Sequence, residues 1–312
     1  YMKHFIEDTD VISFSSLFKL FWRWKWILVS ITAIGGILSI LYAKNQVDVY
    51  RASIITVTPS GKSGGGMSAL SGQLGGLAGL AGISLGGSDK SLKQIKDLVK
   101  SRSFLQKFIE RHQLMPNLIA VVDWDKTNNQ LVYDPEIYDI NTENWVRSPP
   151  PGKSVIPTSW ETYPILLTKI NLQEQVKKDM FILSVDHYSP HLAKKWVELL
   201  LSDINSFYRQ RSQRETQQSI AYLQTALEKT EFSNVKSTIY ELLEEQIKSD
   251  MLSEVRQEFA LETLSGAVLP EDKDHPKRSL IVISGTVLAG LISLLMALIA
   301  NAIFPIASKE LL

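Results

Sequence analysis

The chain has 312 residues, 33 basic and 33 acidic side chains, and 45% hydrophobic residues, which is ordinary for one or two domains. Its balanced charge argues against a dedicated nucleic-acid-binding protein, which would show a basic excess. Because the chain has no cysteines, thiol catalysis, thiolate metal sites and disulfides are excluded.

Two long runs lack any charged residue: 27–43, with 17 residues, and 280–304, with 25. A bilayer core needs roughly 20 apolar residues in a helix, with about 17 as the short limit. Trp22, Trp24, Trp26 and Tyr42 flank or end the first run, as interfacial aromatic residues do. The n-region is too long for a cleaved signal peptide and no small residue precedes Ala43 at the cleavage position, so we predict two uncleaved transmembrane helices, 27–43 and 280–304.

The distribution of basic residues predicts how these helices are oriented. Lys19, Arg23 and Lys25 precede the first run, so residues 1–26 are expected to be cytoplasmic. Residues 44–279 then form a periplasmic domain, and 305–312 a cytoplasmic tail. Lys277 and Arg278 fall on the periplasmic side, which a long translocated loop permits. With so few residues outside this domain, we expect no folded cytoplasmic domain.

The periplasmic part is predicted to begin with a strand over 49–59, which is rich in β-branched residues. Residues 61–87 contain 11 of the 17 glycines, with leucines at helical spacing between them. This composition predicts a mobile loop that is ordered, if at all, against the membrane or a neighbouring subunit. Residues 91–113 are predicted to form one amphipathic helix.

Residues 118–163 are predicted to be irregular, and 163–172 and 180–188 to be paired strands. Ser189 is a candidate N-cap before Pro190, and no glycine or proline follows until Gly266. A break at 230–234, with a new N-cap at Asn234, predicts helices of about 40 and about 30 residues. The fold class is therefore an α+β membrane protein, with two transmembrane helices flanking a periplasmic α/β base (44–188 and 262–279) and a long protruding helical hairpin (189–261).

Two sets of residues are candidates for contacts between helices or subunits. Arg209, Arg211 and Arg214 lie in a polar helical stretch, which predicts an oligomer interface with acidic residues of an adjacent protomer. Small residues in the two apolar runs permit close helix packing in lipid, which predicts a contact between the two helices of one protomer or with a helix of a partner protein. The alternative is that these glycines have no special role, because glycine is common in membrane helices. The candidate packing glycines are Gly35, Gly36, Gly285 and Gly290.

Several motifs resemble phosphate-binding, calcium-binding or metal-binding sites, but each lacks residues or spacing that such a site requires. The "GKS" at 61 and at 152 lacks the earlier glycine of a phosphate loop. Residues 123–134 resemble a calcium loop but lack its turn glycine and its final glutamate, which favours a polar hairpin loop. His187 and His191 do not share a helical face because Pro190 starts the helix between them. We therefore expect no catalytic residues, no cofactor and no metal.

Several segments together resemble the Wzz-type polysaccharide co-polymerases, which determine the chain length of O-antigen and related surface glycans. The residues are the N-terminal anchor, "VYRASIITV", "HYSPHLAKKWVELLLSDIN", "ELLEEQIKSDMLSEVRQEFALETL" and "PEDKDHPKRSLIVISG". The resemblance implies a non-enzymatic regulator of modal chain length in the inner membrane of Gram-negative bacteria. The proline- and lysine-rich motif of the family corresponds to Pro270, Pro276, Lys277 and Arg278, with fewer prolines than the fuller form.

The resemblance also implies the partners: copies of the same chain in a ring, a separate membrane polysaccharide polymerase, the bilayer and a lipid-linked glycan, with no nucleic acid. Two other functions have the same outline. A sensor input domain would need a cytoplasmic output, which the predicted topology does not provide. A periplasmic adaptor or scaffold of a polysaccharide export complex would also use a long helical hairpin, and it remains the alternative.

Overall fold

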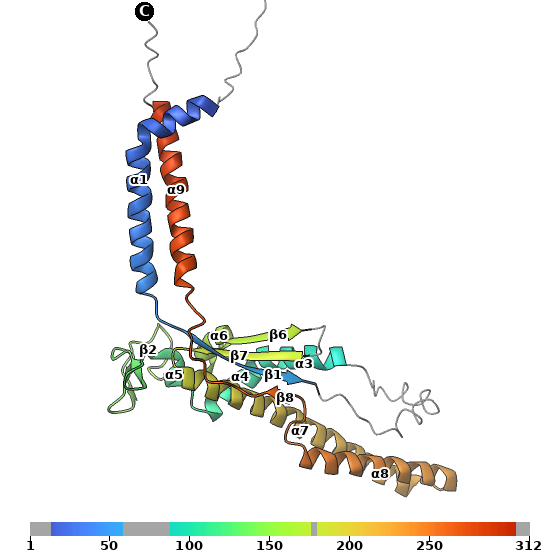
Figure 1. Cartoon of the computed structure of the whole chain (residues 1–312). Helices are drawn as coiled ribbons and strands as arrows, with labels where there is room; N and C mark the ends of the chain where they lie inside the picture. Colours follow the sequence, from blue (N-terminus) through green and yellow to red (C-terminus); the bar gives the residue numbers. More distant parts are fainter. Residues whose placement is uncertain (1–13, 59–87, 176–179, 304–312) are drawn as a thin grey trace, which may run out of the picture. The chain divides into compact units, whose positions relative to one another are not determined.

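The computed structural model describes residues 14–58, 88–175 and 180–303, which fall into two compact units (Figure 1). One unit holds the two long apolar helices, up to Asp48 and from Asp274 onward, and the other spans Val49–Lys273. The predicted mobile loop over 61–87 lies outside the described residues.

The first unit consists of α1 (Phe14–Lys44) and α9 (Arg278–Ile303). Trp24–Lys44 and Arg278–Ala300 are long and apolar enough to cross a membrane, so the prediction of two such helices is confirmed. Only 6% and 11% of their most apolar windows are buried. A core helix of a soluble protein would be mostly buried, so the low burial favours helices that face lipid.

The second unit is built on an antiparallel sheet with the strand order β6 (Ile170–Gln175), β7 (Met180–His187), β1 (Tyr50–Val57) and β8 (Glu262–Ser265). Along β1 the side chains alternate between buried and half-buried, as expected for a strand with one covered face. On its less buried face, the Arg51 guanidinium donates two hydrogen bonds of 2.7 Å to Asp186, its partner on β7. This pair and the buried apolar alternation fix the same register.

Helices cover the buried face of the sheet. They are α3 (Ser88–Lys100), α4 (Arg102–Arg111), α5 (Met115–Ile119), α6 (Ser159–Lys169) and the first half of α7 (Pro190–Lys229). Ile54, Phe108, Leu166, Phe181 and Trp196 are among the fully buried side chains of the resulting core. The second unit is therefore the α+β domain that the alternating patterns predict.

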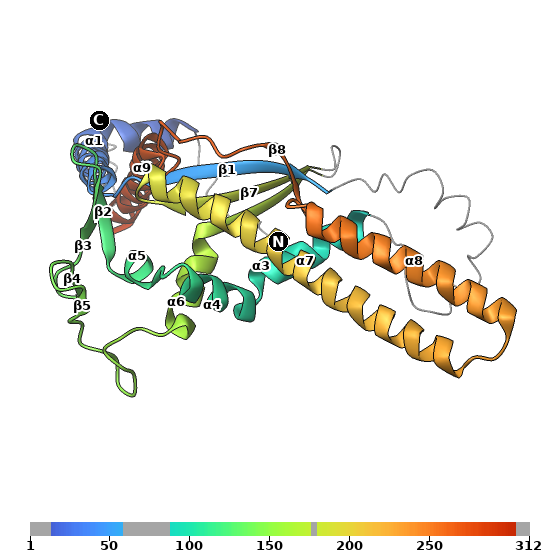
Figure 2. The ribbon, with the colours of Figure 1, turned by 90° about the horizontal axis from the view of Figure 1, so that it is seen from below.

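The second half of α7 and the antiparallel α8 (Ser233–Val255) form a helical hairpin that projects beyond the sheet (Figure 2). The 40 residues of α7 span roughly 60 Å and the 23 residues of α8 roughly 35 Å. The predicted N-cap at Asn234 is wrong, because α8 starts at Ser233 and its N-cap, Phe232, has no capping side chain. The predicted length of about 30 residues for this helix is also too long.

Two further predictions differ from the structure. The expected single helix over 91–113 is two helices, because Ser101 takes an extended conformation and its side chain caps the backbone N–H of Phe104. The expected strand over 163–172 is helical up to Lys169 and is a strand only from Ile170. A capping box formed by Thr158 and Glu161 starts α6, and this local signal outweighs the apolar run that follows it.

Residues 118–163 contain more order than predicted. The strands β2 (Val121–Asp125) and β3 (Gln130–Tyr133) form one hairpin, and β4 (Tyr138–Asp139) and β5 (Asn144–Trp145) form another. The side chain of Asp125 closes the first turn by accepting the backbone N–H of Thr127 at 2.8 Å. This is the polar hairpin loop that the imperfect calcium motif predicts.

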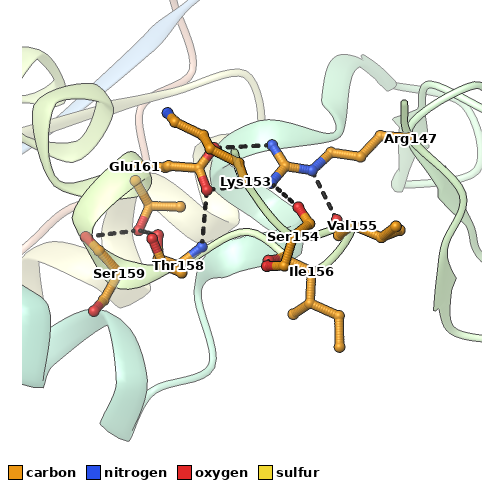
Figure 3. A network of polar contacts seen from close by, with 9 residues as sticks. Arg147, Lys153, Ser154, Val155, Ile156, Thr158, Ser159 and Glu161 are labelled. Atoms are coloured by element: carbon orange, nitrogen blue, oxygen red, sulfur yellow. Dashed lines mark hydrogen bonds and ion pairs between the residues drawn. The ribbon is translucent and has the colours of Figure 1, made fainter. Parts of the chain in front are cut away.

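A polar cluster around Arg147 secures the proline-rich segment before α6 (Figure 3). The Arg147 guanidinium donates to the carbonyl oxygens of Val155 at 2.8 Å and Ser154 at 3.0 Å, and to both carboxylate oxygens of Glu161 at 3.1 and 3.2 Å. These hydrogen bonds hold the pKa of Glu161 below its usual value. One arginine thus fixes the loop and the first turn of α6 together.

Candidate functional site

The helices α1 and α9 pack along the segment marked by small residues. Gly35 lies against Ala289, and Gly285 lies against Ser39. A methyl group added at Gly35 would overlap the Cβ of Ala289, and one added at Gly285 would overlap the Ser39 Oγ and lie 2.9 Å from its Cβ. The two helix backbones therefore approach this closely only because these positions carry no side chain.

The other two candidate glycines lie on the same interface with more space. A Cβ at Gly36 would be 3.4 Å from the Thr286 Oγ1, and one at Gly290 would be 3.9 Å from the nearest Thr32 side-chain atoms. These are ordinary or nearly ordinary contact distances. The structure thus brings all four glycines to the α1–α9 contact, but close approach requires glycine only at Gly35 and Gly285.

The hydroxyl groups at this contact are satisfied largely within their own helices. The Ser39 hydroxyl donates to the Gly35 carbonyl at 2.8 Å, and the Ser293 hydroxyl donates to the Gly290 carbonyl at 2.8 Å. The Thr32 and Ser293 oxygens, 3.4 Å apart, join α1 to α9. Since unsatisfied polar groups are costly in hydrocarbon, these contacts let small polar residues line a tight helix pair.

The predicted membrane-interface residue Arg278 is ion-paired at the first residue of α9. Its guanidinium donates to the Asp48 carboxylate at 3.0 Å and to the Gln46 carbonyl at 3.1 Å. Asp48 and Gln46 follow the end of α1, so one side chain links the two helices at the end where they leave the apolar region. The Arg278 side chain is 39% exposed and that of Asp48 16% exposed, which makes this a partly shielded pair.

The remaining residues of the predicted proline and lysine motif do not form one cluster. Lys277 is exposed and makes no ion pair with any residue that the structure describes. Pro276 precedes it after a cis peptide bond from His275. Pro270 belongs to the other compact unit. Arg278 and Lys277 therefore differ: Arg278 is engaged within its own unit, and Lys277 is available to another molecule.

The three predicted interface arginines lie on the part of α7 that extends beyond the sheet. Arg211 and Arg214 are exposed and Arg209 is half-buried. The Arg211 Nε donates to Glu215, one turn along the same helix, at 2.8 Å. An exposed pair of this kind contributes only a few tenths of a kcal/mol, so it leaves this surface free to contact other groups.

An apolar stripe on α8 was not predicted from the sequence. Tyr240, Ile247, Met251 and Val255 are 59%, 47%, 63% and 80% exposed. A different face of α8 holds the buried residues Ile239 and Leu243, and α8 packs against α7. The signal was present in the sequence, since the exposed residues follow each other at seven, four and four residues and therefore share one helical face.

Comparison with known proteins supports the resemblance on which the prediction was based. The model of the Wzz family, described as "Chain length determinant protein", matches residues 10–112. The predicted resemblance to the chain length determinants is confirmed over these residues. They include α1, β1, α3 and α4, and thus the first apolar helix together with part of the α+β domain.

Two solved structures are similar at low sequence identity. A "full-length bacterial polysaccharide co-polymerase" is 12% identical, with a TM-score of 0.40, and the alignment covers 95% of this chain and 100% of that one. A fragment of WzzB, a polysaccharide co-polymerase from Salmonella Typhimurium, is also 12% identical, with a TM-score of 0.33, and covers 73% of this chain and 100% of that one. No curated protein sequence matches the chain.

Proposed function

We propose that this chain is a non-enzymatic regulator of the chain length of a surface polysaccharide, O-antigen or a related glycan, and that it acts as an oligomer beside a separate membrane polymerase. The observation that carries the proposal is the match of the chain length determinant model to residues 10–112. The matched stretch contains the first apolar helix and continues into the α+β domain.

The proposed topology places the second unit, Val49–Lys273, in the periplasm and both ends of the chain in the cytoplasm. The basic residues before the first apolar helix support a cytoplasmic N-terminus, because cytoplasmic flanks of membrane helices carry an excess of lysine and arginine. The two apolar helices at either end of that unit then return the chain to the side from which it started. The proposed location is the bacterial inner membrane.

Within this topology, we propose roles for the predicted residues that the contacts between α1 and α9 support. Gly35 and Gly285 permit close packing of the helix pair, and Arg278 locks its periplasmic end through Asp48. The exposed Lys277, with Pro276 before it, is the part of the motif that meets lipid headgroups, a lipid-linked glycan or the polymerase. Arg209, Arg211 and Arg214 face a neighbouring copy of the chain.

The test is a polysaccharide ladder gel of a strain that lacks this gene, complemented with the wild-type chain or with an empty vector. The proposal predicts that the deletion changes the modal glycan length and that the wild-type copy restores it. Immunoblotting and cross-linking of the complemented strain give the abundance and the oligomer size of the protein. An unchanged ladder in the deletion strain contradicts the proposal, and loss of glycan export with unchanged length indicates an export adaptor instead.

A further inference from the structure

The projecting hairpin carries two exposed faces of different chemistry on its two helices. On α8 it is the apolar stripe defined above, Tyr240, Ile247, Met251 and Val255. The described residues leave this stripe uncovered although apolar side chains gain free energy when they leave water. Scattered apolar residues on a surface need no explanation, but Ile247, Met251 and Val255 follow each other at intervals of four residues and form a contiguous patch, with Tyr240 beyond Glu244 on the same face, and such patches mark interaction sites.

The exposed face of α7 is basic and ends in aromatic side chains. Phe207, Arg211, Arg214, Gln218 and Tyr222 follow each other at intervals of four, three, four and four residues, so they share one face of the helix. Phe207 is 39% exposed and Tyr222 is 74% exposed. Two large aromatic rings with arginines between them are the residue types that protein interfaces favour.

The charges of the two helices are complementary. Between Ser233 and Val255, α8 has five acidic residues and two lysines, a formal charge of −3. Glu244 lies on the face of the stripe, between Tyr240 and Ile247, whereas Glu241 and Glu245 lie about 100° or more around the helix from Tyr240. Between Phe207 and Tyr222, α7 carries three arginines and one glutamate, a formal charge of +2, and Arg211 and Arg214 lie on the exposed face. Complementary faces of this kind steer association and suppress the pairing of like with like.

We infer that the apolar stripe of α8 in one copy of the chain binds the basic, aromatic face of α7 in the next copy. This inference rests on the proposed function, which includes an oligomer, and it specifies the surface that builds it. Since the two faces lie on different helices of the same hairpin, the contact is heterologous, and repeated heterologous contacts form a ring when their rotation closes. Each copy then donates one face and receives the other.

The first experiment replaces Ile247 and Met251 by glutamine, which removes apolar surface but keeps helix propensity. The matched control is Phe232→Gln, which changes an exposed apolar residue at the hairpin tip, off the stripe. We expect the mass of the full chain, measured in detergent by light scattering, to fall to that of a monomer or to require at least about tenfold more protein to assemble. The control should keep the wild-type mass. A wild-type mass for the double variant overturns the inference.

The second experiment uses charge reversal and stays informative if the glutamine variant fails to fold. One variant carries Arg209→Glu, Arg211→Glu and Arg214→Glu, and the other carries Glu241→Lys, Glu244→Lys and Glu245→Lys. Each alone places like charges on both of its faces and should not assemble. A mixture of the two restores opposite charges at every contact, so it should form oligomers in which the variants alternate. Failure of the mixture to assemble, or assembly of either variant alone, overturns the inference.

These results separate the inference from the proposed function. If deletion of the gene changes the glycan ladder while the α8 variants keep the wild-type mass, the function stands and this interface is wrong. If the variants dissociate but deletion leaves the ladder unchanged, the interface stands and the function is wrong. Binding of the wild-type hairpin face to lipid vesicles, lost in the Ile247→Gln and Met251→Gln variant without any change in oligomer mass, would assign the stripe to a membrane surface and overturn the inference.

Discussion

Asn205, in the middle of α7, binds both backbone polar groups of Leu261. Its Oδ1 accepts the N–H of Leu261 at 2.8 Å, and its Nδ2 donates to the Leu261 carbonyl at 3.0 Å. Oδ1 also accepts the N–H of Ala260 at 2.8 Å. Asn205 and Leu261 are both buried. The chain between α8 and β8 is not helical, so the Asn205 amide supplies hydrogen bonds to backbone groups that a helix would otherwise satisfy.

Asn205→Ala should destabilise the chain by about 2–4 kcal/mol, because it leaves the two buried backbone groups of Leu261 and the part-buried N–H of Ala260 without this partner. The matched variant Asn205→Asp keeps the acceptor for the two N–H groups but buries a carboxylate whose second oxygen faces the Leu261 carbonyl, so it should also be destabilising, and its cost should fall at low pH, where a protonated carboxyl can donate to that carbonyl. Urea unfolding of the full chain in detergent measures both. Equal stability of Asn205→Ala and the wild type would show that the segment finds other hydrogen-bond partners.

This contact explains why the end of α8 could not be predicted from the local sequence. The start of α7 at Pro190, after Ser189 at the N-cap position, was predicted correctly from the local sequence, although the Ser189 side chain makes no capping hydrogen bond. The end of α8 is not, because no glycine or proline stops the helix before Gly266. The chain leaves the helix at Val255 and is held at Leu261 by a side chain 56 residues earlier, a partner that local patterns do not reveal.

For the membrane helices too, the sequence predicted which residues allow close packing but not which residues they contact. Small residues at Gly35 and Gly285 mark a surface for close packing, and this surface could be read from the sequence. Which residue meets which depends on the rotation of both helices, so the contacts of Gly35 with Ala289 and of Gly285 with Ser39 required the structure. The pairing of Arg278 with Asp48 likewise depends on two helix ends that are distant in sequence.

The glycines of the helix pair should respond differently to alanine. Gly285→Ala places a methyl group on the Ser39 hydroxyl and should weaken the pairing of α1 with α9, whereas Gly290→Ala has ordinary contact space and should be tolerated. Because the chain has no cysteines, cysteines introduced at Thr32 and Ser293, whose oxygens are 3.4 Å apart, report the pairing by disulfide formation.

We expect Gly285→Ala to reduce this cross-linking and Gly290→Ala to leave it near the wild-type level. The second-site change Ser39→Gly removes the side-chain atoms that the new methyl group would overlap, so it should restore cross-linking in the Gly285→Ala background. Equal cross-linking in the Gly285→Ala and Gly290→Ala backgrounds would show that the two helices shift apart at little cost.

His187 should make the stability of the chain depend on pH. It is fully buried at the end of β7, its Nδ1 accepts the N–H of Ser189 at 3.0 Å, and its ring lies 4.7 Å from that of Trp196. Burial lowers the pKa of His187 from 6.5 to about 3, because the charged form is poorly solvated there. The unfolded chain therefore binds a proton that the folded chain does not, between these two pH values.

The sign follows from that difference in bound protons. The stabilisation is complete above about pH 6.5 and is lost as the pH falls toward about 3, with a slope of up to about 1.4 kcal/mol per pH unit. His187→Asn retains an acceptor for the Ser189 N–H and cannot titrate, so its unfolding free energy should lack this part of the slope. Identical slopes for variant and wild type, measured by urea unfolding in detergent, would assign the pH dependence to other groups.

The ion pair of Arg278 with Asp48 should support function by holding the ends of α1 and α9 together. The Arg278 guanidinium bridges the Asp48 carboxylate at 3.0 Å and the Gln46 carbonyl at 3.1 Å, and neither charge is fully exposed. Arg278→Ala should cost about 1 kcal/mol of stability and change the glycan ladder, because the ends of α1 and α9 are no longer tied. Lys277→Ala, the matched loss of a charge with no ion pair among the described residues, should leave stability unchanged.

The charge-swapped double variant, Asp48→Arg with Arg278→Asp, distinguishes the pair from the separate charges. If the tie between the helix ends is what matters, the swap should recover most of the ladder control that each single variant loses, since opposite charges again meet across the two ends. If Arg278 instead acts by touching a headgroup, the glycan or the polymerase, the swap should remain defective because the cation has moved to the other helix. Ladder gels at matched protein abundance, with unfolding measured in parallel, separate the two outcomes. Normal ladders in the single variants Asp48→Arg and Arg278→Asp would show that this end of the helix pair is only an anchor.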